Sequence, residues 1–273
     1  MVSSNFISVS AVSNREQLRE INKIYRENGE FPFHLAIGYQ VSSKSINQGT
    51  QNPRQPKFAD LGELSQETWN YRMIPAVHYY TKDGETIISD LEKVAAIIPM
   101  GTILQLNILP PSLNVLEKIR MMGFNPIFKV AVSDKQSSEG GYAVWKGEGV
   151  QDVKTGEIGP LIEQVRERRG FIDYVMFDPS HGTNLDLTLD ENSLAIRFGR
   201  EIAESHDLDS LGLVYAGGIK PSNVKTVLNS LFTYFPRRRI SIDTESGVRT
   251  SDNQLDMGLV RQYLENCRYV LER

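Results

Sequence analysis

The stretch LGLVYAGGIKPSNVKTVLNSLF (residues 211–232) joins an apolar run, a pair of glycines and an amphipathic segment. The run before the glycines is apolar on both faces, which is typical of a strand covered on both sides. The glycines permit a tight turn, and the segment after them has apolar residues at helical spacing. The stretch therefore predicts a strand, a turn and a helix, the repeating unit of a parallel α/β fold.

Seven further apolar runs recur along the chain. They cover residues 5–12, 33–40, 73–80, 102–109, 126–132, 174–180 and 239–246. Helical patterns follow most of them, which is typical of βαβ units. Eight such units in 273 residues predict a single (β/α)₈ barrel, a TIM barrel, over residues 1–273. A doubly wound open sheet is the alternative, but no Gly-x-Gly-x-x-Gly follows the first run.

Local signals mark several helix ends. Ser112 is a candidate N-cap, and Gly123 is a candidate stop for the helix that follows it. Ser89 and Asp90 have the residue types of caps at the start of another helix. Pro221 and Ser222 are expected to begin the helix in the stretch quoted first.

Composition excludes several classes of protein. Hydrophobic residues make up 40% of the chain and charged residues 23%, and the net charge of −4 gives no basic field for nucleic acid. The single cysteine, Cys267, excludes an internal disulfide framework and a cysteine-based zinc site. We recognise no signal peptide and no apolar run that approaches a membrane span. We expect a cytoplasmic protein, monomeric or homodimeric, with no membrane partner.

Two connections are too long for plain turns. They cover residues 41–71, after the second predicted strand, and 133–156, after the fifth. Long loops in compact domains are usually functional or disordered. The second contains Tyr142 and Trp145 among glycines, which favours a lid with an aromatic contact over a disordered linker.

Polar residues stand where the predicted strands end, at the face of the barrel that carries active sites. They are His78, Gln105, Asn107, Lys129, Asp178 and Asp243. Lys129 is expected either to pair with Asp178 or, as an alternative, to form a Schiff base with a carbonyl substrate. Asp243 and Glu245 are candidate caps for the next helix. We predict no metal and no cofactor, with Mg²⁺ held by Asp178, Asp186 and Asp243 as the alternative.

Glycines after the seventh and eighth strands predict a phosphate site. Gly217 and Gly218 follow one strand, and Ser246 and Gly247 follow the next. Glycine lets backbone N–H groups approach an anion closely, and a nearby helix start adds its dipole. The loops after strands seven and eight are the usual phosphate site of this fold, so a phosphorylated small molecule is the expected substrate.

Several of these motifs together resemble the phosphoribosylanthranilate isomerase family. The stretch LVYAGGIKPSNV resembles that family's LAGGL-x-P-x-NV, and SIDTESGVRT resembles its VDVSSGVE. In the same way, TILQLNI resembles the family's VQLHG, QNPRQPKF resembles its SPRYV, and FDPSHGTNLDL resembles its LDS…GGTG. The resemblance covers nearly the whole chain and implies the barrel fold. It also implies an Amadori rearrangement of an aminoaldose phosphate to an aminoketose phosphate.

The resemblance also implies roles for individual residues. Asp178 matches the family's general acid, for which an apolar rim would supply the necessary raised pKa. Arg54 matches the arginine that binds the substrate carboxylate. Gln105 stands in the family's strand-four motif, where Asn107 replaces its histidine. Candidate substrate-binding residues are Arg54, Gln105, Asn107 and His181.

The family's general base has no counterpart. Its strand-one cysteine corresponds to Val9, or to Ser8 or Ser10 if the register shifts by one residue. Candidate replacements are Lys129, His78 and His181. Three functions therefore stay open: an isomerase with a substitute base, a lyase or epimerase acting on another sugar phosphate, and a non-catalytic barrel that binds a phosphorylated metabolite.

Overall fold

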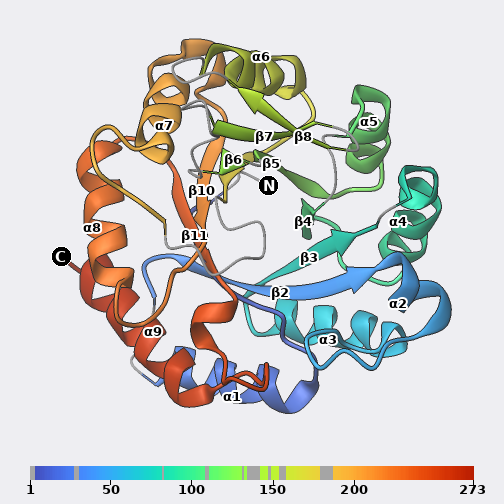
Figure 1. Ribbon diagram of the computed structural model, residues 1–273. Coiled ribbons are helices and arrows are strands. Elements are labelled where there is room, and N and C mark those ends of the chain that lie inside the picture. Colours follow the sequence, from blue (N-terminus) through green and yellow to red (C-terminus); the bar gives the residue numbers. More distant parts are fainter. Residues whose placement is uncertain are drawn as a thin grey trace.

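Eight parallel strands close into a barrel (Figure 1). The computed structural model describes residues 4–27, 31–81, 83–107, 111–130, 158–178 and 187–273, and the backbone alone of 132–133, 142–146 and 149–153. Around the barrel the strands follow the order β1-β11-β10-β9-β5-β4-β3-β2. Because this ring has no open edge, the predicted barrel is confirmed and the open sheet is excluded.

All eight predicted strands are present. They are β1 (Phe6–Ser10), β2 (His34–Ser42), β3 (Ile74–Tyr80), β4 (Ile103–Leu106), β5 (Asn125–Val130), β9 (Tyr174–Phe177), β10 (Gly212–Ala216) and β11 (Ile240–Thr244). The helices that surround them are α1 (Arg15–Arg26), α3 (Phe58–Asn70), α4 (Ile87–Ala95), α5 (Leu113–Met121), α6 (Gly159–Arg168), α7 (Leu194–Glu204), α8 (Val224–Tyr234) and α9 (Met257–Leu271). No helix in the described part of the chain is both long and apolar enough to cross a membrane.

Some helix ends follow the local signals and others do not. The Ser112 side chain caps α5, and Gly123 follows that helix with a φ of 87°, as expected. In contrast, Ser89 and Asp90 lie inside α4, which begins two residues earlier. Helix α8 begins at Val224 and not at Pro221 and Ser222 as predicted, because these two residues belong to a turn before the helix.

The two long connections contain regular structure. Residues 41–71 hold a short helix, α2 (Ser43–Gln48), and all of α3, so the expected long loop shrinks to the segment between them. Residues 133–156 include most of an antiparallel sheet of β6 (Val132–Ser133), β7 (Tyr142–Lys146) and β8 (Gly149–Val153). The side chains of Tyr142 and Trp145 lie outside the described part, so their role in a lid stays a prediction.

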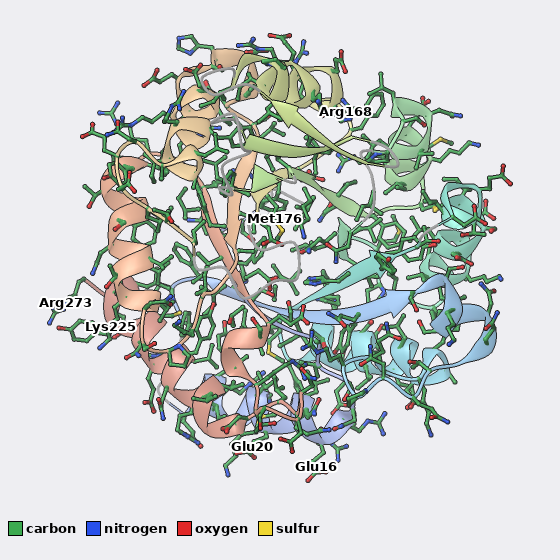
Figure 2. The ribbon with its side chains drawn as sticks, in the orientation of Figure 1. Glu16, Glu20, Arg168, Met176, Lys225 and Arg273 are labelled. Atoms are coloured by element: carbon green, nitrogen blue, oxygen red, sulfur yellow. The ribbon has the colours of Figure 1, made fainter. Side chains whose placement is uncertain are left out.

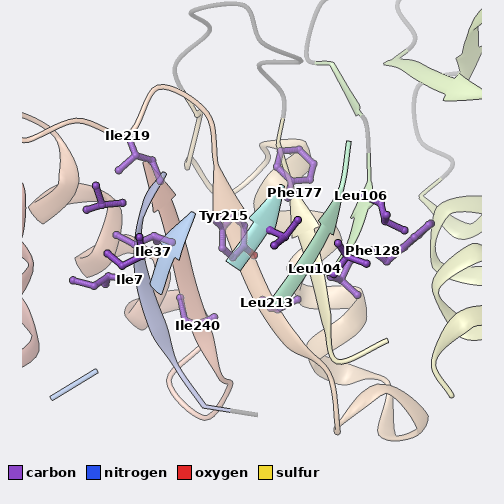
Figure 3. Packing of buried hydrophobic residues seen from close by; sticks show 14 of the residues in the cluster. Ile7, Ile37, Leu104, Leu106, Phe128, Phe177, Leu213, Tyr215, Ile219 and Ile240 are labelled. Carbon is purple, nitrogen blue, oxygen red and sulfur yellow. The ribbon is translucent and has the colours of Figure 1, made fainter. Parts of the chain in front are cut away.

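The strands bury both of their faces. One large cluster joins their outer faces to the helices, and Figure 3 shows part of it around Ile7, Ile37 and Phe128. A second cluster contains strand residues alone: Phe6, Ala36, Ala76, Ile103, Ile127, Tyr174, Met176, Val214 and Ala216. Met176 lies in the middle of the ring, whereas Lys225 and Arg273 lie at its outer edge (Figure 2). This second cluster fills the inside of the barrel.

Polar side chains follow the apolar inner cluster towards the C-terminal ends of the strands. Successive residues of a strand point to opposite faces, so residues two and four positions beyond an inner residue also point inward. This rule places Ser8, Ser10, Gln40, His78, Gln105, Lys129 and Asp178 on the inner face. Asp243 also points inward, because it alternates with Ile240 and Ile242 of the outer cluster. The barrel is thus apolar at its N-terminal end and polar at its mouth.

Asp90 ties α2 to the barrel wall. Its carboxylate is 1% exposed and accepts hydrogen bonds from Asn47 of α2 at 2.9 Å and from Tyr79 of β3 at 2.8 Å. Burial alone would raise the pKa of Asp90, but the hydrogen bonds from its neighbours, which include Ser43, outweigh it and lower the pKa. The ionised carboxylate therefore stabilises the fold.

We predict that Asp90→Asn lowers the free energy of unfolding by about 1–3 kcal/mol at neutral pH, since it leaves buried hydrogen-bond donors without an acceptor. A lowered folded-state pKa contributes stability above the unfolded pKa, which is about 3.9. The difference between variant and parent should therefore shrink as the pH falls below that value. Urea unfolding across this pH range measures it, with Glu92→Gln on the exposed face of α4 as the control. An equal loss for both variants would contradict the assignment.

Candidate active site

The first strand contributes a serine that contacts a carboxylate at the mouth. Ser10 Oγ donates to Asp243 Oδ1 at 2.5 Å, and Ser8 Oγ lies 3.1 Å from Ser10 Oγ. Val9 is fully buried in the outer cluster, against the helices. Of the three positions that could correspond to the family's cysteine, the two serines therefore face the site and Val9 does not.

Lys129 and Asp178 form an ion pair on neighbouring strands. Lys129 Nζ lies 2.6 Å from Asp178 Oδ2, and their side chains are 15% and 10% exposed. The predicted pairing is therefore present. An ammonium in contact with a carboxylate favours the ionised carboxylate, whereas the apolar rim expected from the sequence would favour the protonated acid. The pair places an ammonium and a carboxylate in direct contact at the mouth.

Amide side chains extend this polar wall to β4. Gln105 Nε2 donates to Asn107 Oδ1 at 2.9 Å, and Lys129 Nζ donates to the same oxygen at 3.4 Å. Gln105 is 4% exposed, and its Oε1 atom has no hydrogen-bond partner among the described residues. His78 is in register with Gln105 and is equally buried. These predicted residues do converge, and Gln105 Oε1 is a buried acceptor without a hydrogen-bond donor among the described residues.

Arg54 reaches the mouth from the segment between α2 and α3. Its Nη1 atom lies 3.0 Å from Glu245 Oε1, and its Nη2 atom donates to Asn253 Oδ1. Gln40 Nε2 donates to the same Glu245 oxygen at 2.7 Å. Glu245 is therefore a partner of Arg54 rather than the helix cap expected from its position.

The glycine loops after β10 and β11 pack against each other. Gly217 and Gly218 have φ angles of 103° and 62°, which glycine adopts without strain. Thr244 Oγ1 donates to the carbonyl of Ile219 at 2.6 Å. A Cβ on Gly247 would lie 1.9 Å from that carbonyl oxygen, so only glycine fits there.

These loops leave backbone donors available. The N–H groups of Gly218 and Gly247 donate to no other described residue. The Asn223 side chain makes no capping bond to α8; it bonds instead to the Gly218 carbonyl and the Lys220 N–H, both at 2.9 Å. The predicted phosphate residues therefore lie together, with Ser246 exposed beside them. Phosphate binding itself stays a prediction.

Other predicted residues lie elsewhere. His181 and Asp186 are outside the described residues, and Cys267 is fully buried in α9, where burial raises its pKa. Within the described residues no group of three His, Cys, Asp or Glu side chains could hold a metal ion. An open polar hollow of about 1230 Å³ lies beside the mouth, between the segment 42–55 and the end of β3, and none of the predicted site residues line it.

Two features of the site were not predicted from the sequence. One is the contact of Ser10 with Asp243, and the other is the pairing of Glu245 with Arg54. Alternation along β1 and β11 gives a signal for the first, because it places both side chains inside the barrel. Nothing in the local sequence indicates the second.

Comparison with curated proteins finds phosphoribosylanthranilate isomerases. The N-(5'-phosphoribosyl)anthranilate isomerase of Methanocella arvoryzae is 30% identical over 124 residues, which are 44% of this chain and 52% of that protein. The protein of the same name from Methanosarcina acetivorans is 33% identical over 115 residues, or 40% of this chain and 41% of that protein. The matches thus span about half or less of the relatives' own lengths. No family model matches the chain.

Solved structures of the same kind share the fold. N-(5'-phosphoribosyl)anthranilate isomerase from Pyrococcus furiosus matches with a TM-score of 0.56 and 16% identity, over 97% of this chain and 100% of that one. TrpF from Jonesia denitrificans matches with a TM-score of 0.55 and 10% identity, over 98% of both chains. The sequence matches confirm the resemblance indicated by the motifs, and the structural matches confirm the barrel.

We predict that Gly247→Ala weakens binding of ribose phosphate by at least about tenfold, because the new Cβ must push the two glycine loops apart. Overpacking of this kind should also lower the free energy of unfolding by about 1–3 kcal/mol. Calorimetric titration and urea unfolding measure the two effects. Gly159→Ala is the control, since its Cβ would meet no atom within 4 Å. Unchanged phosphate affinity in a destabilised variant would show that the glycine serves packing alone.

Proposed function

We propose that this chain catalyses an Amadori-type isomerisation of a phosphorylated aminoaldose at the mouth of its barrel. The observation that carries the proposal is the buried Lys129–Asp178 ion pair, which projects into the mouth near the glycine loops. The sequence similarity to phosphoribosylanthranilate isomerases supports the same reaction class. The substrate's phosphate would bind at the N–H groups of Gly218 and Gly247, with its sugar over the inner rim.

The Lys129–Asp178 pair would supply the acid. In the first step a proton passes to the ring oxygen while the bond from that oxygen to the aminated carbon breaks, and an open-chain iminium forms. Lys129 Nζ gives up one of its ammonium protons, and Asp178 Oδ2 at 2.6 Å holds the ammonium in place. The neutral amine that results regains a proton from solvent after the step. Proton transfer by a positioned group contributes about 10²–10⁴-fold to a rate.

Asp243 is the base that the geometry favours. It is 8% exposed, accepts one hydrogen bond from Ser10, and pairs with no cation among the described residues. It lies on β11, which only β10 separates from β9, where Asp178 stands. The carboxylate would take the proton from the carbon beside the iminium, and the electrons of that C–H bond would form the enamine. Protonation of the aminated carbon and loss of the hydroxyl proton then give the ketone.

His78 has a smaller role in this proposal. It is buried beside Gln105 on the wall opposite the glycine loops, so it would contact the substrate and not the reacting proton. Gln105 and Asn107 would orient the sugar hydroxyls. The proposed isomerisation steps use neither a metal nor a cofactor. Cytoplasmic localisation and a monomeric or homodimeric state stay predictions.

We predict that Asp178→Asn and Lys129→Met each lower kcat by about 10²–10⁴-fold, since either change removes half of the proton-transferring pair. Turnover is measured with freshly prepared phosphoribosylamines of aniline and of anthranilate, by the appearance of the aminoketose phosphate. Binding of ribose phosphate should persist in both variants, which controls for misfolding. If the parent chain converts neither amine at enzyme concentrations near that of substrate, the proposed isomerase activity is wrong, and a binding function would take its place.

We predict that Asp243→Asn also lowers kcat by at least about 10²-fold, because an amide cannot accept the proton. Ser10→Ala should lower kcat by a smaller factor, since it removes only the hydrogen bond that orients the Asp243 carboxylate. Exchange of the substrate's carbon-bound hydrogen with deuterated solvent, followed by NMR, reports the base directly. Exchange that survives in Asp243→Asn and disappears in His78→Gln would assign the base to His78 instead.

A further inference from the structure

Glu245 places a carboxylate over the substrate side of the mouth. It follows β11 directly and continues the inward-facing positions Ser241 and Asp243 on that strand. Its Oε1 atom accepts from Gln40 Nε2 at 2.7 Å, and Gln40 lies on the inner face of β2. The side chain therefore leans across the mouth from β11 towards β2, one layer above the Ser10–Asp243 contact.

Glu245 forms an ion pair with Arg54 on that side of the mouth. Arg54 Nη1 is 3.0 Å from Glu245, and Arg54 Nη2 donates to Asn253. Each terminal nitrogen of the guanidinium thus already donates to a protein acceptor. The two side chains are 32% and 26% exposed, so the pair is partly shielded from water and holds more firmly than a surface pair.

A carboxylate on the substrate would come close to the Glu245 carboxylate at this side of the mouth. To pair with Arg54 it would have to lie against the Glu245 carboxylate or displace it, and a displaced Glu245 Oε1 would keep only the neutral hydrogen-bond donor Gln40. Asp243 lies below, so this half of the mouth would hold three carboxylates against two guanidiniums, those of Arg54 and of Arg249, whose charge also interacts with Glu245. Like charges brought together in a shielded site strongly disfavour binding.

We propose that Glu245 makes the site select an aminoaldose phosphate whose amine substituent carries no carboxylate. The proposal rests on the proposed function and specifies its substrate class. An uncharged ring or a hydroxylated substituent fits the Arg54–Glu245 pair without breaking it. Glu245 is a specificity-determining residue in this view, and Arg54 positions it.

The test compares two aminoketose phosphates, one made from aniline and one from anthranilate, which differ only in the carboxylate. Calorimetric titration of the parent protein should show at least about tenfold tighter binding of the aniline compound. Glu245→Gln should remove that preference by strengthening binding of the anthranilate compound, while affinity for the aniline compound stays within about twofold. Adding Arg54→Met to Glu245→Gln should abolish the gain, because the freed guanidinium is its source.

Asp252→Asn is the matched control, since it removes an exposed negative charge next to Asn253 without touching Arg54. Equal affinity of the parent for the two compounds, or tighter binding of the anthranilate compound that Arg54→Met removes, would overturn the proposal and leave the isomerase activity standing. Failure of the parent to bind either compound would overturn the proposed function as well. Binding of both compounds without turnover would reject the catalytic role but not the selectivity.

Discussion

The closed ring of parallel strands is the constraint on which the rest of the molecule depends. Closure leaves no open sheet edge, so each strand must bury one face against helices and the other inside the barrel. The inner face has room for a single set of side chains, and Phe6, Tyr174 and Met176 occupy it at one end. The inner positions at the other end are therefore free to carry polar groups, and these groups make up the candidate site.

Charge at the mouth is organised in pairs. One ion pair joins Lys129 to Asp178 across neighbouring strands, and another joins Arg54 to Glu245 from distant segments of the chain. Both pairs are partly shielded from water. Asp243 differs, because a serine hydroxyl is its partner. This contrast in partners separates the proposed acid from the proposed base.

The glycine loops form the candidate phosphate site. Their close packing, with Gly247 against the Ile219 carbonyl, holds backbone N–H groups in place without any side chain between them. A preformed cradle of this kind binds an anion with little loss of conformational freedom. These loops and Asp178 carry motifs that resemble the phosphoribosylanthranilate isomerase family, and the structure adds the contacts of Arg54 with Glu245 and Asn253.

The sequence by itself determined the eight strands, the barrel and the places where polar residues end those strands, because alternation and helical spacing are local properties. It also indicated the Lys129–Asp178 pair and the glycine loops. Only the tertiary structure decided that residues 43–48 and 58–70 are helical, that Ser10 and not Val9 faces inward, and which group Arg54 contacts. Ser10 and Asp243 are 233 positions apart, and Arg54 and Glu245 are 191 apart. Contacts over such separations depend on how the ring closes and on the register between strands, which no local pattern encodes.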